Sequence, residues 1–597
     1  MRRFLVLTLC LFLLFSSLSL AESQTTLRIA GRLDSLNLFF LRDFQFWDRI
    51  IVSAIWEPLY VWSPQFQRLI PWLANGEPII DANEKTVTIH LKRGIHWSAN
   101  EVFTQAREFT AKDVVFTYKT HLEFGLDLLP FAVSWSSAFE ILLKAINNVT
   151  EVDKYTVRFE MQEHTPLLQY CGLTWQIIPS HQWGPIVEEA RTKTNPGAFI
   201  TNFSFTPSAS QPLPESVGKP IGTGPYTLDS WNEDEMILVK RNDYTPPVQE
   251  IEINGQLGTL GPYIDRIQVK GINNSDRTKI EMVQKDVADV GFLVFQGNRI
   301  DPFMIPELDA SETMDVHSSR SNMTLYFEYN QQKEPFNDTA FRKATRILID
   351  ELHLIRESLN GYGEESYSVI APANSNWYNP DTPAYGKGLN RVDRIQEAVR
   401  VLEGAGYTWG GKPVIENGEL VRKGQRLILP NGEAMELFTI IAPAWDISRQ
   451  LGAIHIQQWL EDIGVFSVVV YYDVDRLVQA LYEGDETWDA NVMAFAEAPI
   501  YPYHLYEFCY PYEDDELRGY SSQRCHELGE EFMWSMDEAR QHELAFELQE
   551  MIGEDLPLIV LHFRNQIDVV NNRFTGWVEQ LDGFANMWSL FLVKPYE

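Results

Sequence analysis

The sequence predicts an α/β protein with mixed sheets, because segments with the period of a helix alternate with segments that have the period of a strand. Residues 86–91 (TVTIHL) alternate apolar and polar side chains, as a half-buried strand does. Residues 448–463 carry the apolar face of a helix that stops at Gly464, and residues 465–472 (VFSVVVYY) follow as a buried strand. Helix-then-strand units of this kind are typical of α/β folds.

The same arrangement recurs elsewhere in the chain. Residues 392–402 and 535–552 each carry an apolar face of helical period, and Ser535 offers a capping box for the second helix. Residues 558–563 (LIVLHF) then read as another strand. Residues 409–436 contain two Asn-Gly dipeptides, which are typical of tight turns, and we expect an inserted hairpin there.

The N-terminus has the pattern of a secretory signal peptide. Arg2 and Arg3 precede the apolar run 4–20, and Ser19 and Ala21 are small residues at the −3 and −1 positions of a cleavage site. A membrane anchor is the weaker interpretation, because the run is shorter than the ~20 residues that span a bilayer. We therefore expect cleavage after about Ala21 and a soluble, exported, periplasmic protein.

The charge of the chain excludes two classes of partner. The formal net charge is −34, and loss of the two arginines of the signal peptide takes the mature chain to −36. A polyanion of this kind repels nucleic acid and anionic lipid. We expect a monomer that binds no nucleic acid.

Three cysteines remain after cleavage of the signal peptide: Cys171, Cys509 and Cys525. In an oxidising compartment, the last two, 16 positions apart, predict a disulfide that closes a surface loop. A metal site is the alternative, since His526 follows Cys525, but no second Cys-x-x-Cys or His-x-x-x-His supports it. We expect no metal, and a buried free thiol at Cys171.

No catalytic constellation stands out in the sequence. H-E-x-x-H, G-x-S-x-G and G-x-x-x-x-G-K-[ST] do not occur. Residues 222–226 (GTGPY) lack the lysine and helix start of a phosphate cradle, so we expect their glycines to serve a tight turn. A glycoside hydrolase with paired carboxylates is the serious enzyme alternative, because the chain has 83 acidic residues and many aromatic ones. Since no pair is singled out, we predict a protein without catalytic residues or cofactors.

At six points, in order along the chain, the sequence resembles the extracellular solute-binding proteins of family 5, which serve ABC importers. The first is Pro71-Trp-Leu-Ala74, and the third, residues 221–231 (IGTGPYTLDSW), is close to the most recognisable signature of that family. The other four points are residues 86–119, 329–350, 401–409 and 540–561. Together they span nearly the whole mature chain.

The resemblance implies a two-lobed, three-domain periplasmic binding protein fold of the type II or cluster C kind, with a ligand cleft between the lobes. Such a protein closes over its ligand, delivers it to a membrane permease and performs no chemistry. The expected domains are a base domain of lobe 1 (residues 22–62, 200–315 and 568–597), an accessory domain of lobe 1 (63–199) and lobe 2 (316–567).

Residues 497–516 (EAPIYPYHLYEFCYPYEDDE) place six aromatic rings among three prolines. The prolines disfavour a regular helix, so the rings either pack in a core or line a site that binds a ligand. Flat rings bury the apolar faces of sugars and of peptide side chains alike. We expect an aromatic-lined cleft whose ligand-binding residues are Phe44, Phe46, Trp47, Trp377, Trp445, Glu497, Tyr501 and Tyr503.

The class of ligand rests on two opposed signals. Peptide binders of this family commonly carry an Asp-Pro element before the corresponding cysteine, and its aspartate meets the α-ammonium group of the peptide. This sequence has Ala498-Pro499 instead, with Glu497 beside it. The frequency of peptide binders in the family favours an oligopeptide, whereas the lost aspartate and the supply of Trp and Tyr favour an oligosaccharide. We expect an oligopeptide, with an oligosaccharide as the alternative.

Overall fold

The computed structural model describes most of the chain beyond the predicted signal peptide, residues 1–21, which lies outside the described residues. The described residues are 25–31, 46–66, 68–125, 136–202, 217–232, 234–253, 255–271, 281, 283, 285–291, 304–482, 488–496, 500–509, 519–581, 583–584 and 586–596.

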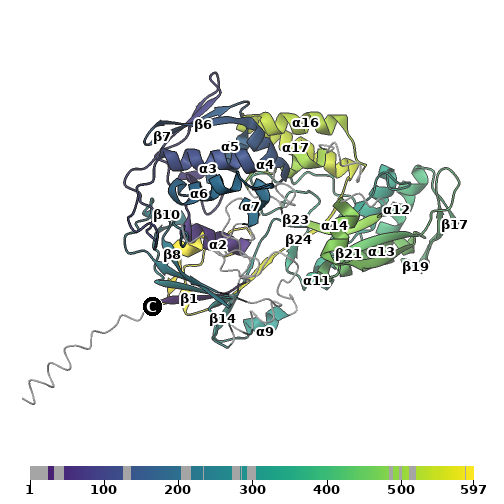
Figure 1. Cartoon of the computed structure of the whole chain (residues 1–597). Coiled ribbons are helices and arrows are strands. Elements are labelled where there is room, and N and C mark those ends of the chain that lie inside the picture. The colour runs from purple at the N-terminus through teal and green to yellow at the C-terminus, as the bar shows by residue number, and fades with distance from the viewer. Residues whose placement is uncertain are drawn as a thin grey trace, which may run out of the picture.

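The first large sheet has seven strands in the order β14-β25-β13-β1-β12-β9-β8. Strand β1 runs parallel to β12 and β13, and the other neighbours are antiparallel. We call the part of the molecule built on this sheet lobe 1 (Figure 1). Its strands are β1 (Thr26–Gly31), β8 (Tyr226–Trp231), β9 (Glu235–Lys240), β12 (Arg266–Gly271), β13 (Val290–Gly291), β14 (Met314–Ser319) and β25 (Gln566–Asn571).

The second large sheet has six strands in the order β16-β24-β15-β23-β21-β22, and it defines lobe 2. Strand β21 is parallel to both of its neighbours, and the remaining pairs are antiparallel, so both sheets are mixed as predicted. The strands are β15 (Met323–Tyr329), β16 (Gly363–Glu364), β21 (Phe438–Pro443), β22 (Ser467–Tyr472), β23 (Ala490–Ala496) and β24 (Ile559–Arg564).

Two neighbouring crossovers join the sheets. The chain passes from β14 to β15 through residues 320–322, and from β24 back to β25 through Asn565. The Ser321 hydroxyl donates to the carbonyl oxygen of Arg564 at 2.6 Å, and the Asn565 side chain donates to the Ser318 hydroxyl at 3.0 Å. Within the described residues, the chain therefore passes between the two large sheets at two short crossovers that are tied to each other.

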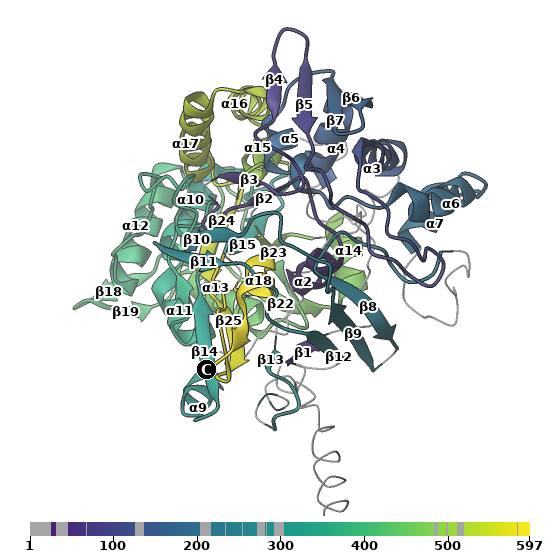
Figure 2. The ribbon, with the colours of Figure 1, turned by 90° about the vertical axis from the view of Figure 1, so that its left-hand side faces the viewer.

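An antiparallel sheet of four strands, β4-β5-β7-β6, extends lobe 1, and we call it the accessory sheet. The strand predicted at residues 86–91 is β5 in this sheet. Figure 2 shows the accessory sheet above β8, β9 and β12. Its elements are β4 (Ile79–Asp81), β5 (Thr86–His90), β6 (Ile146–Asp153) and β7 (Thr156–Met161), with α3 (Ala111–Phe124), α4 (Ser136–Ala145), α5 (Pro166–Tyr170) and α6 (Ser180–Ala190).

The predicted helices of lobe 2 form with small shifts of their ends. Helix α12 (Arg391–Gly404) and helix α13 (Ile447–Asp462) pack, with α10 (Thr339–Leu348), on one face of the six-stranded sheet. The helix expected from Ser535 begins instead at Glu538, because the side chain of Asp537 accepts the first free backbone N–H groups. Ser535 ends the preceding helix, α16 (Gln523–Trp534), so the predicted capping box is wrong.

The insertion predicted at residues 409–436 forms two antiparallel strand pairs, a hairpin and the pair of strands that flank it, which project from lobe 2 (Figure 1). In the hairpin of β18 (Val414–Glu416) and β19 (Glu419–Arg422), Asn417 and Gly418 have φ of 52° and 79°. Two successive positive φ values match the twist of a hairpin and explain the Asn-Gly dipeptide.

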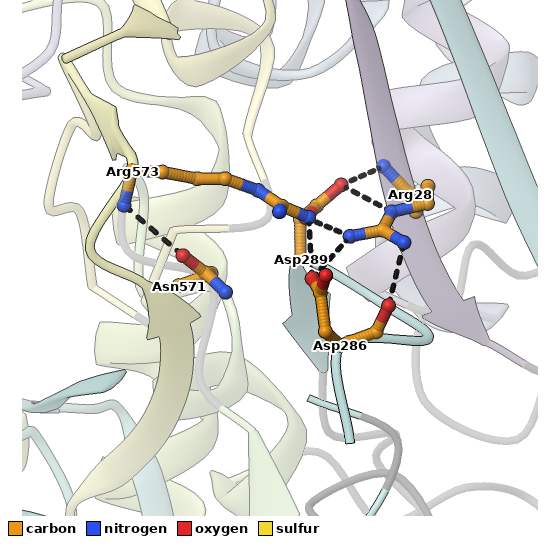
Figure 3. Close-up of polar contacts among 5 residues, drawn as sticks. All are labelled: Arg28, Asp286, Asp289, Asn571 and Arg573. Atoms are coloured by element: carbon orange, nitrogen blue, oxygen red, sulfur yellow. Dashed lines mark hydrogen bonds and ion pairs between the residues drawn. The ribbon is translucent and has the colours of Figure 1, made fainter. Parts of the chain in front are cut away.

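A buried carboxylate joins three strands of lobe 1 through hydrogen bonds and ion pairs (Figure 3). Asp289, at the start of β13, accepts from the backbone N–H of Arg28 at 2.7 Å and pairs with the guanidinium groups of Arg28 on β1 and Arg573 beyond β25. The backbone N–H of Asn571 donates to the Asp289 carbonyl oxygen at 2.6 Å. These bonds fix β1, β13 and β25 as neighbours although they lie far apart in the sequence.

Candidate ligand-binding site

Residues 500–509 and the two helices that follow connect the lobes. After β23 of lobe 2, the chain forms α15 (His504–Cys509), α16 and α17 (Glu538–Asp555) and then returns to lobe 2 as β24. In Figures 1 and 2, α16 lies beside the accessory sheet and α5 of lobe 1. The Thr165 hydroxyl of lobe 1 donates to the carbonyl oxygen of Met533 in α16 at 3.0 Å. The segment between β23 and β24, which are both strands of lobe 2, therefore packs on lobe 1.

A column of four aromatic rings crosses this junction. Trp62 stacks on Tyr170, with ring centroids 5.6 Å apart, Tyr170 stacks on Tyr501 at 4.9 Å, and Tyr501 stacks on Phe532 at 4.7 Å. We call these four residues the aromatic column. Trp62 and Tyr170 belong to lobe 1, whereas Tyr501 and Phe532 belong to the segment that returns to lobe 2. The column thus attaches that segment to lobe 1 by apolar contact.

Three of the residues expected to bind ligand are packed against protein in this structure. Tyr501 is 0% exposed, Tyr503 1% and Trp377 3%. The Tyr501 hydroxyl donates to the Phe532 carbonyl oxygen at 2.7 Å, and burial raises the pKa of Tyr501 well above its usual value. Trp377 meets Tyr501 edge-on at 5.6 Å and stacks on His542 at 4.3 Å. Their contact with a ligand stays a prediction.

The remaining expected ligand-binding residues divide into two groups. Phe44 and Glu497 lie outside the described residues, and Phe46 and Trp47 open α2 (Phe46–Ile55) with side chains that the structure does not describe. Trp445 is half-buried at the end of β21, and the guanidinium of Arg449 lies 5.7 Å from the centre of its ring. Trp445 packs against the same large apolar cluster that contains Tyr501 and Phe532.

A buried ion cluster that the sequence reasoning missed lies next to Trp445. Asp446 caps α13 by accepting from the backbone of Ser448 and Arg449, and its carboxylate pairs with Arg449 at 2.9 Å and with Arg564 at 3.3 Å. Arg564 is the last residue of β24, directly before the crossover to lobe 1. We call Asp446, Arg449 and Arg564 the hinge ion cluster. The pairing of Asp446 with Arg449 has a local signal in the sequence, because an N-cap aspartate is followed three positions later by an arginine. No local pattern predicts the pairing of Asp446 with Arg564.

The face of the lobe 2 sheet opposite α10, α12 and α13 carries polar groups. Leu325 and Val492 point to the helices, and their chain neighbours Thr324 and Asn491 point the other way. Within the described part of the chain, the Thr324 hydroxyl and the Asn491 side-chain oxygen are buried and have no hydrogen-bond partner. Buried polar atoms of this kind are normally satisfied in native structures.

The disulfide expected from the cysteine spacing is present between Cys509 and Cys525. It joins the end of α15 to the first turn of α16 and so fixes the segment that carries Tyr501. Cys171 is a free, half-buried thiol, and burial raises the pKa of Cys171 to about 12. Among the described residues, no group of three or more His, Cys, Asp or Glu side chains could hold a metal ion.

The two glycines of the GTGPY segment are required for close packing of the backbone rather than for a turn. A Cβ atom on Gly222 would lie 1.7 Å from the carbonyl oxygen of Ile55, and one on Gly224 would lie 2.6 Å from that of Ala54. Neither glycine has a positive φ, so neither is needed for backbone freedom. They are needed because the chain passes directly over the end of α2, where the Gly224 N–H donates to the Ile55 carbonyl oxygen at 2.9 Å.

Comparison with known sequences identifies the family. The profile described as "Bacterial extracellular solute-binding proteins, family 5 Middle" matches residues 68–512. The chain belongs to this family. Membership confirms the resemblance and places the protein among extracellular solute-binding proteins, a class without catalytic activity. No helix in the described ranges is both long and apolar enough to cross a membrane.

The curated relatives of this family 5 protein are distant. The dipeptide-binding protein of Escherichia coli K12 is 25% identical over 340 residues, which cover 55% of each chain, so the match spans about half the length of that relative. The oligopeptide-binding protein AppA of Bacillus subtilis 168 is 21% identical over 499 residues, covering 82% of this chain and 77% of AppA.

Solved structures share the fold of the family 5 chain along nearly its whole length. AppA from B. subtilis, solved with a nonapeptide, superposes with a TM-score of 0.66 at 17% identity and covers 96% of this chain and 100% of its own. DppA from Helicobacter pylori, solved with the peptide STSA, gives a TM-score of 0.68 at 17% identity, covering 96% and 99%. The two-lobed α/β fold of periplasmic binding proteins is thereby confirmed.

Proposed function

We propose that this protein captures an oligopeptide and delivers it to the permease of an ABC importer. The observation that supports it most is the family 5 match over residues 68–512. The relatives named above are dipeptide- and oligopeptide-binding proteins, and both solved structures carry peptides. The two expected alternatives, an oligosaccharide ligand and glycoside hydrolysis, receive no support from these relatives.

The ligand would lie between the lobes. The lobe 2 sheet offers Thr324 and Asn491 on the face away from its helices, and both have buried oxygens that lack a partner among the described residues. A peptide backbone carries alternating N–H and C=O groups that can satisfy such atoms. Trp445 and the hinge ion cluster lie in the same lobe, where Arg449 and Arg564 supply positive charge.

We further propose where the mature protein begins, where it acts and how its domains divide the chain. The mature protein would begin after about Ala21, act in the periplasm as a monomer, and bind no nucleic acid, metal or cofactor. The proposed domains keep the bounds 22–62, 200–315 and 568–597 for the base of lobe 1, 63–199 for its accessory domain and 316–567 for lobe 2. The docking of α16 on lobe 1 would make part of the last domain a bridge between the lobes.

Mass spectrometry of the molecules that co-purify with the protein, released by denaturation, tests the proposal directly. We expect peptides. Purified protein should then bind synthetic copies of those peptides in calorimetry, and neither peptides nor α- or β-linked oligosaccharides should be cleaved during incubation. Recovery of a sugar that rebinds the refolded protein, with no binding of peptides, would assign the oligosaccharide function instead. Turnover of any ligand that follows the purified protein would assign an enzyme.

A further inference from the structure

The two lobes also contact each other at a place away from the crossovers. Helix α5 of lobe 1 packs against α16, which belongs to the segment between β23 and β24 of lobe 2. In Figures 1 and 2, α5 and α16 lie near the top of the molecule, whereas β14, from which one crossover leads, lies toward the bottom. A rotation of one lobe at the crossovers would therefore move α5 and α16 apart.

The helices that α5 contacts are held by lobe 2. Gln549 of α17 is buried, and its side-chain oxygen accepts from the backbone N–H of Asn379 at 2.9 Å and from the Ser368 hydroxyl at 2.7 Å. The guanidinium of Arg342 in α10 donates to the carbonyl oxygen of Leu556, directly after α17, at 3.1 Å. Since α16 packs on α17, both helices would follow lobe 2 when the lobes rotate.

Tyr170, the last residue of α5, carries the apolar part of this contact. Its ring stacks on Tyr501 at 4.9 Å and meets Trp377 edge-on at 6.5 Å, and both partners lie on the lobe 2 side. Within lobe 1, Tyr170 stacks on Trp62 at 5.6 Å, and the Trp62 indole N–H donates to the Tyr170 carbonyl oxygen at 3.1 Å. The Tyr170 hydroxyl makes no hydrogen bond to another described residue, so the ring acts by packing alone.

Thr165, the N-cap of α5, supplies the polar part of the contact. Its hydroxyl donates to the Met533 carbonyl oxygen at 3.0 Å, and both residues are buried. A hydrogen bond that is shielded from water is stronger than an exposed one. We call Thr165 and Tyr170, with their partners Met533, Tyr501 and Trp377, the α5 latch. Every contact of the latch joins two protein groups, so none of them needs a ligand to form.

We propose that the α5 latch holds the lobes together before a ligand arrives and so sets the fraction of the protein that is closed. The inference rests on the proposed function, because it concerns how the proposed ligand site closes. A ligand that binds only one arrangement has an apparent affinity that is lowered in proportion to the population of that arrangement. The latch therefore raises affinity without touching the ligand.

Small-angle X-ray scattering of the mature protein without added ligand tests the latch. Tyr170→Ala removes a half-buried ring and its stacking on Tyr501, so the lobes should separate and the radius of gyration should increase. Tyr170→Phe keeps the stack and is the matched control, which should scatter like the parent. Thr165→Val keeps the shape of the side chain but removes its donation to Met533, and it should change the radius in the same direction as Tyr170→Ala.

Calorimetry with the co-purified peptide measures the consequence for binding. Tyr170→Ala should weaken peptide binding by roughly two- to tenfold, the factor expected for loss of one stacked aromatic pair, and Tyr170→Phe should bind like the parent. Saturating peptide should return the radius of gyration of Tyr170→Ala to that of the peptide-bound parent, because the ligand then holds the lobes closed.

The two measurements separate this inference from the proposed function. An unchanged radius of gyration in folded Tyr170→Ala and Thr165→Val overturns the latch, whether or not the parent binds peptide. Weaker peptide binding by Tyr170→Ala with the radius of the parent would mean that Tyr170 contacts the ligand, and this also overturns the latch. A parent that binds no peptide would overturn the proposed function, and scattering alone would then decide the latch.

Discussion

Asp446 has three roles at once, since it caps α13 and pairs with both Arg449 and Arg564. Burial raises its pKa, but the two guanidinium groups outweigh that effect and hold the pKa of Asp446 below the usual value for an aspartate. All three side chains are buried beside the crossover. Buried charges are tolerated only when paired, so the cluster depends on its one carboxylate.

Replacing Asp446 by Asn should lower the free energy of unfolding by about 3–5 kcal/mol, because two buried guanidinium groups lose their counter-ion. Asn retains the helix cap, so the loss reports on the ion pairs. Urea unfolding at pH 7 measures it. Asp537→Asn is the matched control: Asp537 caps α17 in the same way but is exposed, and the change should stay below about 0.5 kcal/mol. Equal losses in both variants would contradict the argument.

The same carboxylate predicts a pH dependence of stability. The pKa of Asp446 in the folded protein lies below the ~3.9 of an unfolded aspartate, so its ionised form stabilises the fold above that value. The contribution is lost as the pH falls through 3.9 towards the folded pKa. The difference in urea midpoint between parent and Asp446→Asn should therefore be constant from pH 7 to 5 and shrink below pH 4. A difference in urea midpoint that stays constant down to pH 3 would mean that the loss of stability in Asp446→Asn comes from packing and not from the ionised carboxylate.

At the scale of elements, the aromatic column joins α16, the helix that precedes α17, to lobe 1. These helices interrupt lobe 2 in the sequence, yet Tyr501 and Phe532 continue a stack that begins with Trp62 and Tyr170 of lobe 1. The Cys509–Cys525 disulfide then fixes α15 to α16. Stacked aromatic pairs add roughly 0.5–1.5 kcal/mol each beyond the area that they bury. The column is therefore a substantial contact between the lobes.

Tyr501→Ala should destabilise the protein by about 3–5 kcal/mol, as expected for removal of a fully buried aromatic ring. Tyr501→Phe keeps the stack and loses one hydrogen bond to the Phe532 carbonyl oxygen, at a cost of about 1–3 kcal/mol. Tyr596→Ala, a ring that is 73% exposed, is the control and should be neutral. Thermal unfolding of the three variants measures the series. A neutral Tyr501→Ala that binds peptide weakly would instead restore the expectation that this ring contacts ligand.

At the scale of the whole molecule, two short crossovers connect the large sheets, and the hydrogen bond from Ser321 to Arg564 joins them. Lobe 1 is held together across long sequence separations, as Arg28 and Asp289, 261 positions apart, show. Short crossovers of this kind can act as hinges, because small backbone changes there reorient one sheet relative to the other. A ligand that binds only the folded, closed form stabilises it by mass action.

A bound peptide at about 100 times its dissociation constant should raise the free energy of unfolding by about 2.7 kcal/mol. Urea unfolding with and without the co-purified peptide measures this. A scrambled peptide at the same concentration is the control and should give a smaller shift. The shift should grow with the logarithm of peptide concentration. A shift that saturates near the protein concentration and grows no further would contradict simple binding to the native state.

Local patterns in the sequence by themselves determined the helices and strands that carry strong periodicity. Residues 448–463 and 465–472 became α13 and β22 with their ends moved by one or two positions, because apolar spacing and a glycine stop act over a few residues. The spacing of Cys509 and Cys525 indicated their disulfide. The ordered family segments indicated the two-lobed fold and the solute-binding class.

Only the tertiary structure decided which side chains meet. Asp446 and Arg564 are 118 positions apart, and no local pattern links them. Tyr501 and Trp377 were expected to face a ligand, but in the fold they pack on each other and on the aromatic column, which brings in Tyr170 from lobe 1. A ring's burial depends on what the rest of the chain places against it. Periodicity reports which face of an element is apolar, and the docking of distant elements determines what covers that face.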